Sequence, residues 1–249
     1  MLQNGFVLDQ TIQTTAKDFM VDDLGNYYLI HSTHIERINA VGGQRFRTSD
    51  LAYGNIEYLD VTNPLKPFIY YRDIGKLVIF DNTLSQQGNA VDLFEIGLEQ
   101  IEQVAGSRGD AYWIWDARNS EMIRVDNNFK KIISTGNLSV LLSKQIGPVQ
   151  IIERGSYVYL RDAVYGVFVF DIYGTYKTLL KIETSSDIQI RNDELIYSDS
   201  THLHVLDKTW LNDSEFVLPV TTNNRVVFFN KHLFTLHENE LRIWSWSEK

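Results

Sequence analysis

Six polar residues mark the places along the chain where a binding site is predicted. Each stands at or near the start of a short apolar segment, and successive members are about 40 residues apart; they are Asp18, Glu57, Glu102, Gln150, Asp187 and Arg225. If these segments line one central channel, four carboxylates, one amide and one guanidinium meet at its mouth. Carboxylates held close together raise one another's pKa and attract cations. The pattern therefore predicts a ligand-binding site at the channel mouth.

The composition excludes several kinds of active site. The chain contains no cysteine, which rules out disulfides, zinc–thiolate sites and thiol nucleophiles. It has no Gly-x-Ser-x-Gly hydrolase motif and no glycine-rich phosphate loop. His31 and His34 are predicted to flank a hairpin turn, and His202 and His204 to point to opposite faces of one strand. No catalytic residue and no metal ligand is therefore predicted.

Four aspartates at the ends of apolar segments have a structural interpretation. Asp81, Asp126, Asp171 and Asp207 occur once per unit at the same point of the pattern. An aspartate at this point can accept hydrogen bonds from backbone N–H groups of the turn that follows. We expect these four carboxylates to stabilise turns rather than to act as acids or bases.

The segments that must position all of these residues repeat six times. The clearest unit, Gly155–Ile182, contains three β-branched and aromatic runs separated by short turns. The residues that end the second strand of successive units are again about 40 residues apart; they are Asn39, Asp81, Asp126, Asp171, Asp207 and Ser245. Periods near 40 with four short strands are typical of propeller blades. The sequence predicts an all-β, six-bladed β-propeller with four-stranded antiparallel blades.

The repeat accounts for the whole chain, so residues 1–249 are predicted to form a single propeller domain. The sixth unit ends without room for a fourth strand, and a spare strand, Phe6–Ile12, precedes the first unit. We expect this N-terminal strand to complete the last blade. Leu138–Lys144 is predicted as a short helical turn with Asn137 as its N-cap. The predicted blades span approximately residues 16–50, 55–95, 100–136, 147–182, 186–219, and 223–249 with 5–13.

Net charge limits the kinds of partner. The formal charge is −9, whereas binding to nucleic acid requires clustered lysine and arginine. No run of apolar residues is long enough to span a membrane as a helix, and the first residues lack the pattern of a secretion signal. Neither nucleic-acid binding nor membrane insertion is predicted.

Three stretches carry a resemblance to known propellers. Asp60–Lys66, Asp81–Ser85 and Phe170–Tyr176 resemble segments of six-bladed propellers of the NHL/YVTN-like group and of a bacterial propeller family of unassigned function. The resemblance implies the fold and export to the periplasm with a signal removed; without export the protein would be cytoplasmic. It transfers no catalytic residue, and a shared fold does not define a function.

Three functional hypotheses follow. The first is a non-catalytic binding module that recognises a protein or peptide on one face of the ring. The alternative is a metal-dependent, lactonase-like hydrolase that uses the channel-mouth carboxylates. The third is a structural component of a larger assembly. No cofactor is predicted for the binding module, whereas the hydrolase requires a divalent cation in the central channel.

Overall fold

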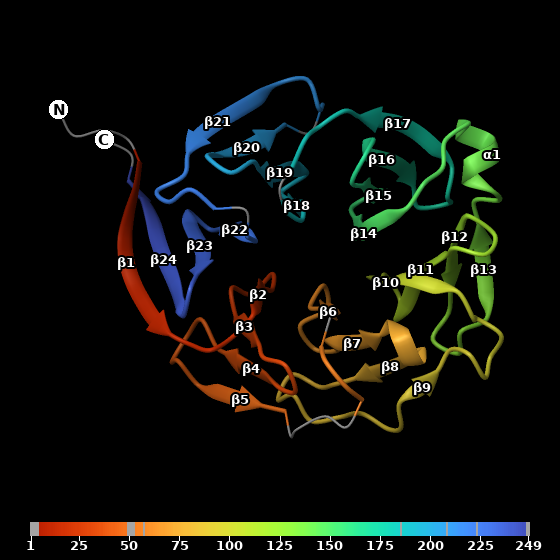
Figure 1. Ribbon diagram of the computed structural model, residues 1–249, viewed down its shortest axis with the longest axis horizontal. Helices are drawn as coiled ribbons and strands as arrows, with labels where there is room; N and C mark the ends of the chain where they lie inside the picture. Colours follow the sequence, from red (N-terminus) through yellow and green to blue (C-terminus); the bar gives the residue numbers. More distant parts are fainter. Residues whose placement is uncertain are drawn as a thin grey trace. The chain divides into compact units, whose positions relative to one another are not determined.

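The fold consists almost entirely of β-strands. The computed structural model describes residues 5–48, 53–56, 58–184, 186–207, 209–222 and 224–247. These residues form six four-stranded sheets in which each strand pairs antiparallel with its neighbours (Figure 1). The fold class predicted from the sequence, a six-bladed β-propeller with four-stranded antiparallel blades, is confirmed. The blades fall into two compact units, Met1–Leu51 with Glu183–Lys249, and Ala52–Ile182.

The first unit contains three blades. The first blade consists of β2 (Asp18–Val21), β3 (Tyr27–Ile30), β4 (Ile35–Ile38) and β5 (Arg45–Arg47). The fifth blade consists of β18 (Gln189–Arg191), β19 (Glu194–Ser198), β20 (His202–Leu206) and β21 (Asp213–Val217). The sixth blade consists of β22 (Val226–Phe229), β23 (His232–His237), β24 (Glu240–Ser247) and β1 (Gly5–Gln13).

The second unit contains the other three blades. The second blade consists of β6 (Tyr58–Asp60), β7 (Phe68–Tyr71), β8 (Lys76–Ile79) and β9 (Val91–Asp92). The third blade consists of β10 (Ile101–Ser107), β11 (Ala111–Asp116), β12 (Glu121–Val125) and β13 (Lys131–Ser134). The fourth blade consists of β14 (Pro148–Arg154), β15 (Tyr157–Asp162), β16 (Gly166–Asp171) and β17 (Tyr176–Leu180).

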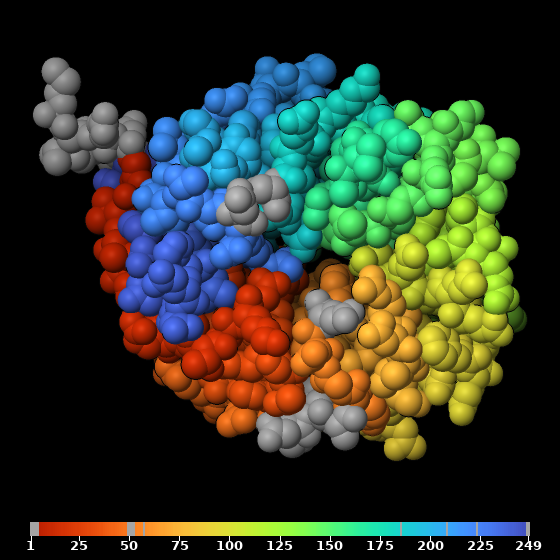
Figure 2. Space-filling model, in the orientation of Figure 1, coloured from red at the N-terminus to blue at the C-terminus, as the bar shows by residue number. Residues whose placement is uncertain are grey.

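The N-terminal strand completes the sixth blade, as the sequence predicts. β1 pairs antiparallel with β24 from Gly5 opposite Ser247 to Gln13 opposite Glu240, with a bulge between Leu8 and Gln10. Figures 1 and 2 show the red N-terminal segment on the surface beside the blue C-terminal strands. This pairing gives β24 a partner on its outer side and leaves β1 as the outer strand of that sheet.

Burial decreases from the middle strands of a blade to its outer strand. β16 buries Gly166–Phe170, and the cluster that contains Phe168 and Phe170 packs it against the third blade. The outer strand β13 has three exposed residues and one half-buried residue. In the second unit, Trp113, Trp115 and Phe168 belong to one buried cluster between the third and fourth blades. The apolar cores therefore lie between blades, where aromatic side chains bury the most surface.

Two short helices interrupt the strands. Leu138–Leu142 (α1) is helical, and Asn137 accepts a hydrogen bond from the Val140 N–H at 2.9 Å, so the predicted N-cap is confirmed. Arg72–Ile74 (η1) forms a 3₁₀ turn directly after β7. Gly75 ends this turn with φ 62°, and Phe94 lies where a Cβ at this position would be, so the position favours glycine.

The strand-end aspartates accept backbone hydrogen bonds in the turns that follow them, as predicted. Oδ1 of Asp171 accepts from the N–H groups of Tyr173 and Thr175 at 2.9 and 3.0 Å. Oδ1 of Asp126 accepts from Asn128 and Lys130 at 2.9 Å each. Asp81 and Asp207 accept from the residues two and four positions later in the same way. In each turn the residue three positions after the aspartate has positive φ. The bend takes backbone N–H groups out of strand pairing, and the aspartate carboxylate accepts their hydrogen bonds instead.

The Asp126 turn allows a direct test of turn stabilisation by a strand-end aspartate. Asp126→Ala removes the acceptor of two backbone hydrogen bonds and should lower the free energy of unfolding by about 1–2 kcal/mol. Asp126→Asn keeps an acceptor oxygen and should cost less than half of that. Urea denaturation of both variants measures the difference. Equal losses in the two variants would show that charge, and not the hydrogen-bond acceptor, stabilises the turn.

Acidification should weaken the same turns. Hydrogen bonds from Thr209 and Asn212 hold the pKa of Asp207 below its ordinary value. A lowered folded-state pKa contributes stability above the unfolded-state value of about 3.9, and this contribution is lost as pH falls through the folded-state pKa. Wild type should therefore be more stable than Asp207→Asn at pH 7, and the two urea midpoints should converge toward pH 2. A constant difference between pH 7 and pH 2 would contradict this role.

Candidate functional site

The structure brings three of the six predicted site residues into contact. Asp18, Asp187 and Arg225 form one cluster in the first unit. In the second unit, Glu102 is exposed at the wall of a cavity, and Gln150 is buried on β14. Glu57 lies outside the described residues. The convergence of all six residues at one channel mouth stays a prediction. The members in the first unit and those in the second unit have different surroundings.

Arg225 bridges two carboxylates from neighbouring blades. Its Nε and Nη2 donate to the Asp18 carboxylate at 2.9 to 3.2 Å, and its Nη1 donates to Asp187 Oδ2 at 2.6 Å. Burial disfavours the charged guanidinium, but attraction to Asp187 and Asp18 outweighs it, and the pKa of Arg225 is raised. One positive charge, just before β22, thus pairs with two negative charges, one at the start of β2 and one just before β18. The arginine occupies the position between these carboxylates that a cation would otherwise take.

Gln189 adds a second contact between the same inner strands. Its side-chain amide donates to the Val226 carbonyl at 2.8 Å and accepts from the Phe228 N–H at 3.0 Å. The backbone groups of β22 that face β18 are therefore satisfied by a side chain. Together with the Arg225 cluster, this contact gives the inner strands of the fifth and sixth blades a fixed register.

Glu102 borders a cavity of about 420 Å³ in the second unit. Its wall also contains the buried Trp115 and the carboxylate of Asp162. Asp162 already accepts hydrogen bonds from the N–H groups of Gly147, Val164 and Tyr165 at 2.7 to 3.0 Å. The cavity therefore offers Glu102 beside an apolar wall, with no cationic side chain among its described lining residues.

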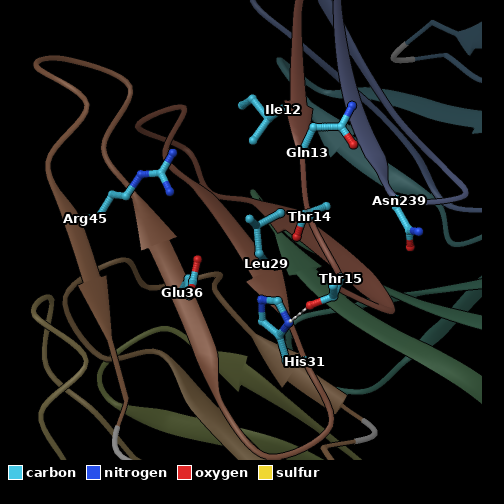
Figure 3. Close-up of a pocket in the computed structure, with 9 residues that line it drawn as sticks. All are labelled: Ile12, Gln13, Thr14, Thr15, Leu29, His31, Glu36, Arg45 and Asn239. Atoms are coloured by element: carbon cyan, nitrogen blue, oxygen red, sulfur yellow. Dashed lines mark hydrogen bonds between the residues drawn. The ribbon is translucent and has the colours of Figure 1, made fainter.

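A second cavity, of about 490 Å³, lies in the first unit where the end of β1 meets the first blade. We call it the β1 pocket (Figure 3); its lining residues are Ile12, Gln13, Thr14, Thr15, Leu29, His31, Glu36, Arg45 and Asn239. This volume is in the range of small-ligand sites in proteins. The lining combines an arginine, a glutamate, an imidazole, two hydroxyls and two side-chain amides. Such a wall can pair with both charges of a polar ligand and can satisfy its hydrogen bonds.

Backbone pairing positions the walls of the β1 pocket. Thr14 N–H donates to the Asn239 carbonyl at 2.8 Å, and Lys17 N–H donates to the Ile30 carbonyl at 2.8 Å. The chain between β1 and β2 is thereby held against the end of β3. His31 N–H donates to the His34 carbonyl at 3.0 Å, which closes the turn to β4 and confirms the predicted hairpin. Strands and tight turns therefore hold the pocket side chains, a rigid arrangement suited to recognition.

His31 has an unusual environment at the edge of this pocket. Its ring stacks on the His34 ring with centroids 4.2 Å apart. Its Nδ1 lies 3.3 Å from the Thr15 hydroxyl, the contact that Figure 3 marks with a dashed line. Its Nε2 is buried and has no hydrogen-bond partner among the described residues. Burial lowers the pKa of His31, as do His34 and Arg47, while Glu36 acts in the opposite direction. The imidazole is therefore favoured in its neutral form.

Sequence reasoning missed this pocket, although one local signal was readable. His31, His34 and Glu36 form a His-x-x-His-x-Glu pattern across a hairpin. One ligand atom from each residue lies within 4.8 Å of those of the other two. The sequence analysis predicts a hairpin turn at His31 and His34 and no metal ligand, because a metal site requires three converging ligands and convergence is visible only in three dimensions.

The prediction for His202 and His204 was wrong. Their rings are 6.3 Å apart, because residues two apart on a strand point to the same face. His204 lies between two carboxylates: Nδ1 is 3.2 Å from Asp213 Oδ2, and Nε2 is 3.4 Å from Asp199 Oδ2. His204, Asp213 and Glu215 form a second group of potential metal ligands. In this group both ring nitrogens already have carboxylate partners.

Comparisons with known proteins confirm the fold and leave the family open. The sequence matches no family model and no curated protein sequence. Among solved structures, virginiamycin B lyase from Staphylococcus aureus matches with a TM-score of 0.64 and 11% identity, over 97% of this chain and all of that one. YCF48 bound to D1 peptide matches with a TM-score of 0.59 and 9% identity, over 100% and 99% of the two chains. BamB from Moraxella catarrhalis matches with a TM-score of 0.54 and 9% identity, over 98% of each.

The names of these solved structures differ in kind. The first structure carries the name of a lyase, and the second contains a bound peptide. At such low identity they establish the fold alone. No helix among the described residues is long and apolar enough to cross a membrane.

The Arg225 cluster predicts a specific pattern of stability changes. Arg225→Met leaves Asp18 and Asp187 facing each other without a counter-charge and should lower the free energy of unfolding by about 2 kcal/mol. Adding Asp18→Asn and Asp187→Asn removes that repulsion and should restore most of the loss. Chemical denaturation of the single and triple variants tests both steps. A single variant as stable as wild type would show that the cluster does not hold the blades together.

Proposed function

We propose that the protein is a binding module that recognises a peptide segment of a partner protein in the β1 pocket. The single observation that supports this function is the set of side chains that line the pocket, together with the strands and turns that position them. Arg45 and Glu36 provide opposite charges, and Thr14, Thr15 and Gln13 provide hydrogen-bonding groups around a volume of about 490 Å³. An extended peptide presents charged side chains together with backbone N–H and C=O groups, which these residues complement.

Two further observations favour binding over catalysis. Arg225 engages Asp18 and Asp187, two of the carboxylates on which the hydrolase alternative depends. Glu102 belongs to the other unit and faces a different cavity. The structural similarity to YCF48 bound to D1 peptide adds a precedent for peptide recognition by this fold. A hydrolase would have to use carboxylates in another arrangement.

Selection from a random peptide library displayed on phage tests the proposal. The immobilised full chain should enrich peptides that share a motif, and the synthetic peptide should bind with a measurable dissociation constant. Arg45→Ala removes the only cationic side chain among the described pocket-lining residues and should weaken binding at least about tenfold.

The matched control is Arg118→Ala. Arg118 is also exposed, and it pairs with Glu99 in the other unit; neither residue is among the described residues that line the β1 pocket. This variant should bind the selected peptide like wild type. Absence of enriched peptides, or equal loss of affinity in the two variants, would contradict recognition in this pocket.

A further inference from the structure

We propose that His31, His34 and Glu36 bind a first-row divalent metal ion, best Zn²⁺, at the edge of the β1 pocket. Two imidazoles and one carboxylate are a common protein ligand set for zinc in sites with an open position. All three residues come from one hairpin, β3–β4, and one ligand atom of each lies within 4.8 Å of the other two. The site is separate from the channel-mouth residues and goes beyond peptide recognition.

The spacing between His34 and Glu36 fits a bridging ion better than a direct contact. His34 Nε2 and Glu36 Oε1 are 3.7 Å apart. This distance is too long for a hydrogen bond. Two ligand atoms on tetrahedral zinc are about 3.3 Å apart, given bonds of about 2.0–2.1 Å. The separation of these two atoms is therefore close to that of two ligands on one ion.

His31 provides a ring nitrogen without another role. Its Nε2 is buried and lacks a hydrogen-bond partner among the described residues, which is costly for a polar atom unless something else satisfies it. Its Nδ1 faces the Thr15 hydroxyl at 3.3 Å. An Nδ1–H that donates to this hydroxyl leaves the Nε2 lone pair available, as in metal sites where a second residue fixes the histidine tautomer.

One adjustment is required for coordination. The His31 and His34 rings are nearly parallel, with 9° between their planes, so the in-plane lone pairs of the two rings do not converge. His34 must rotate about its side-chain bonds to direct a nitrogen toward the ion. The rotation exchanges ring stacking for a metal–nitrogen bond.

The neighbouring charges indicate what the fourth ligand would be. His31 and Glu36 line the β1 pocket, so an open coordination position faces this cavity. A divalent ion with two neutral imidazoles and one carboxylate has a net charge of +1. Arg45 in the same cavity adds another positive charge, and Arg47 lies opposite Glu36 on β5. The fourth ligand is therefore expected to be an anion, either hydroxide or the carboxylate of a bound molecule.

The His204 group is the weaker candidate and serves as a control. Both of its ring nitrogens have carboxylate neighbours, at 3.2 and 3.4 Å. Its ring also stacks on Tyr197 with 4.5 Å between centroids. These contacts explain the histidine without a metal ion.

Titration of the metal-free full chain with Co²⁺, followed by displacement with Zn²⁺, tests the site. Wild type should bind one tight equivalent with the visible absorption of tetrahedral cobalt, and metal analysis should find one zinc per chain. His31→Gln and Glu36→Gln should weaken binding at least about 100-fold, because each removes a ligand. His204→Gln should bind like wild type. No peptide is present, so the result is independent of the proposed peptide recognition.

Three outcomes would overturn the assignment. The first is no tight binding in wild type, and the second is an affinity in His31→Gln equal to that of wild type. The third is loss of binding in His204→Gln alone, which would place the metal on β20 and β21. Thr15→Val keeps all three ligands and should weaken binding about tenfold through the tautomer of His31. It remains informative if circular dichroism shows that His31→Gln does not fold.

Discussion

The pairing of β1 with β24 is the constraint on which the first unit's pocket depends. It joins the two ends of the chain along nine residues of β1, with Gln13 opposite Glu240 at its inner end. The next residues leave the sheet in a fixed direction, because Thr14 is bonded to Asn239 and Lys17 to Ile30. Without this pairing, no strand would position Thr14 and Thr15 beside His31. A strand added from the other end of the chain thus completes both a sheet and a binding surface.

Charged side chains fix how neighbouring blades meet in both units. In the second unit, the buried Glu153 accepts hydrogen bonds from Trp113 Nε1 at 2.6 Å and from Arg108 Nε at 2.5 Å. Burial raises the pKa of Glu153, but these donors outweigh it and the net pKa is lowered. In the first unit, Arg225 has the corresponding role between Asp18 and Asp187. Apolar packing between blades is non-directional, so such pairs provide the specificity of register that packing alone does not.

Most of the fold was predictable because its causes are local and periodic. The aspartate turns, the Asn137 cap and the apolar middle strands each depend on residues a few positions apart, and a repeat presents the same signal six times. The closing strand Phe6–Ile12 was predictable by elimination, since the last unit lacked a fourth strand. The 3₁₀ turn after Tyr71 was less predictable, because Gly75 ends it and Phe94 lies against that position.

The binding site was less predictable because its parts come from distant segments. Asp18 begins β2, and Asp187 and Arg225 stand just before β18 and β22, but the ion pairs among them depend on how blades pack. The β1 pocket combines residues 12–15, 29–45 and 239, and no sequence period links them. His31, His34 and Glu36 were visible as a pattern, whereas the unpartnered Nε2 of His31 was not. His202 and His204 were misplaced by an error in strand periodicity rather than by missing information.

Diffraction at the zinc absorption edge from crystals of the full chain grown with one equivalent of Zn²⁺ tests the assignment of the β1 pocket most directly. The pocket assignment predicts one strong anomalous peak within bonding distance of His31 Nε2, between His34 and Glu36, with its open side toward Arg45. A peak at His204 and Asp213, or no peak within the first blade, would contradict it.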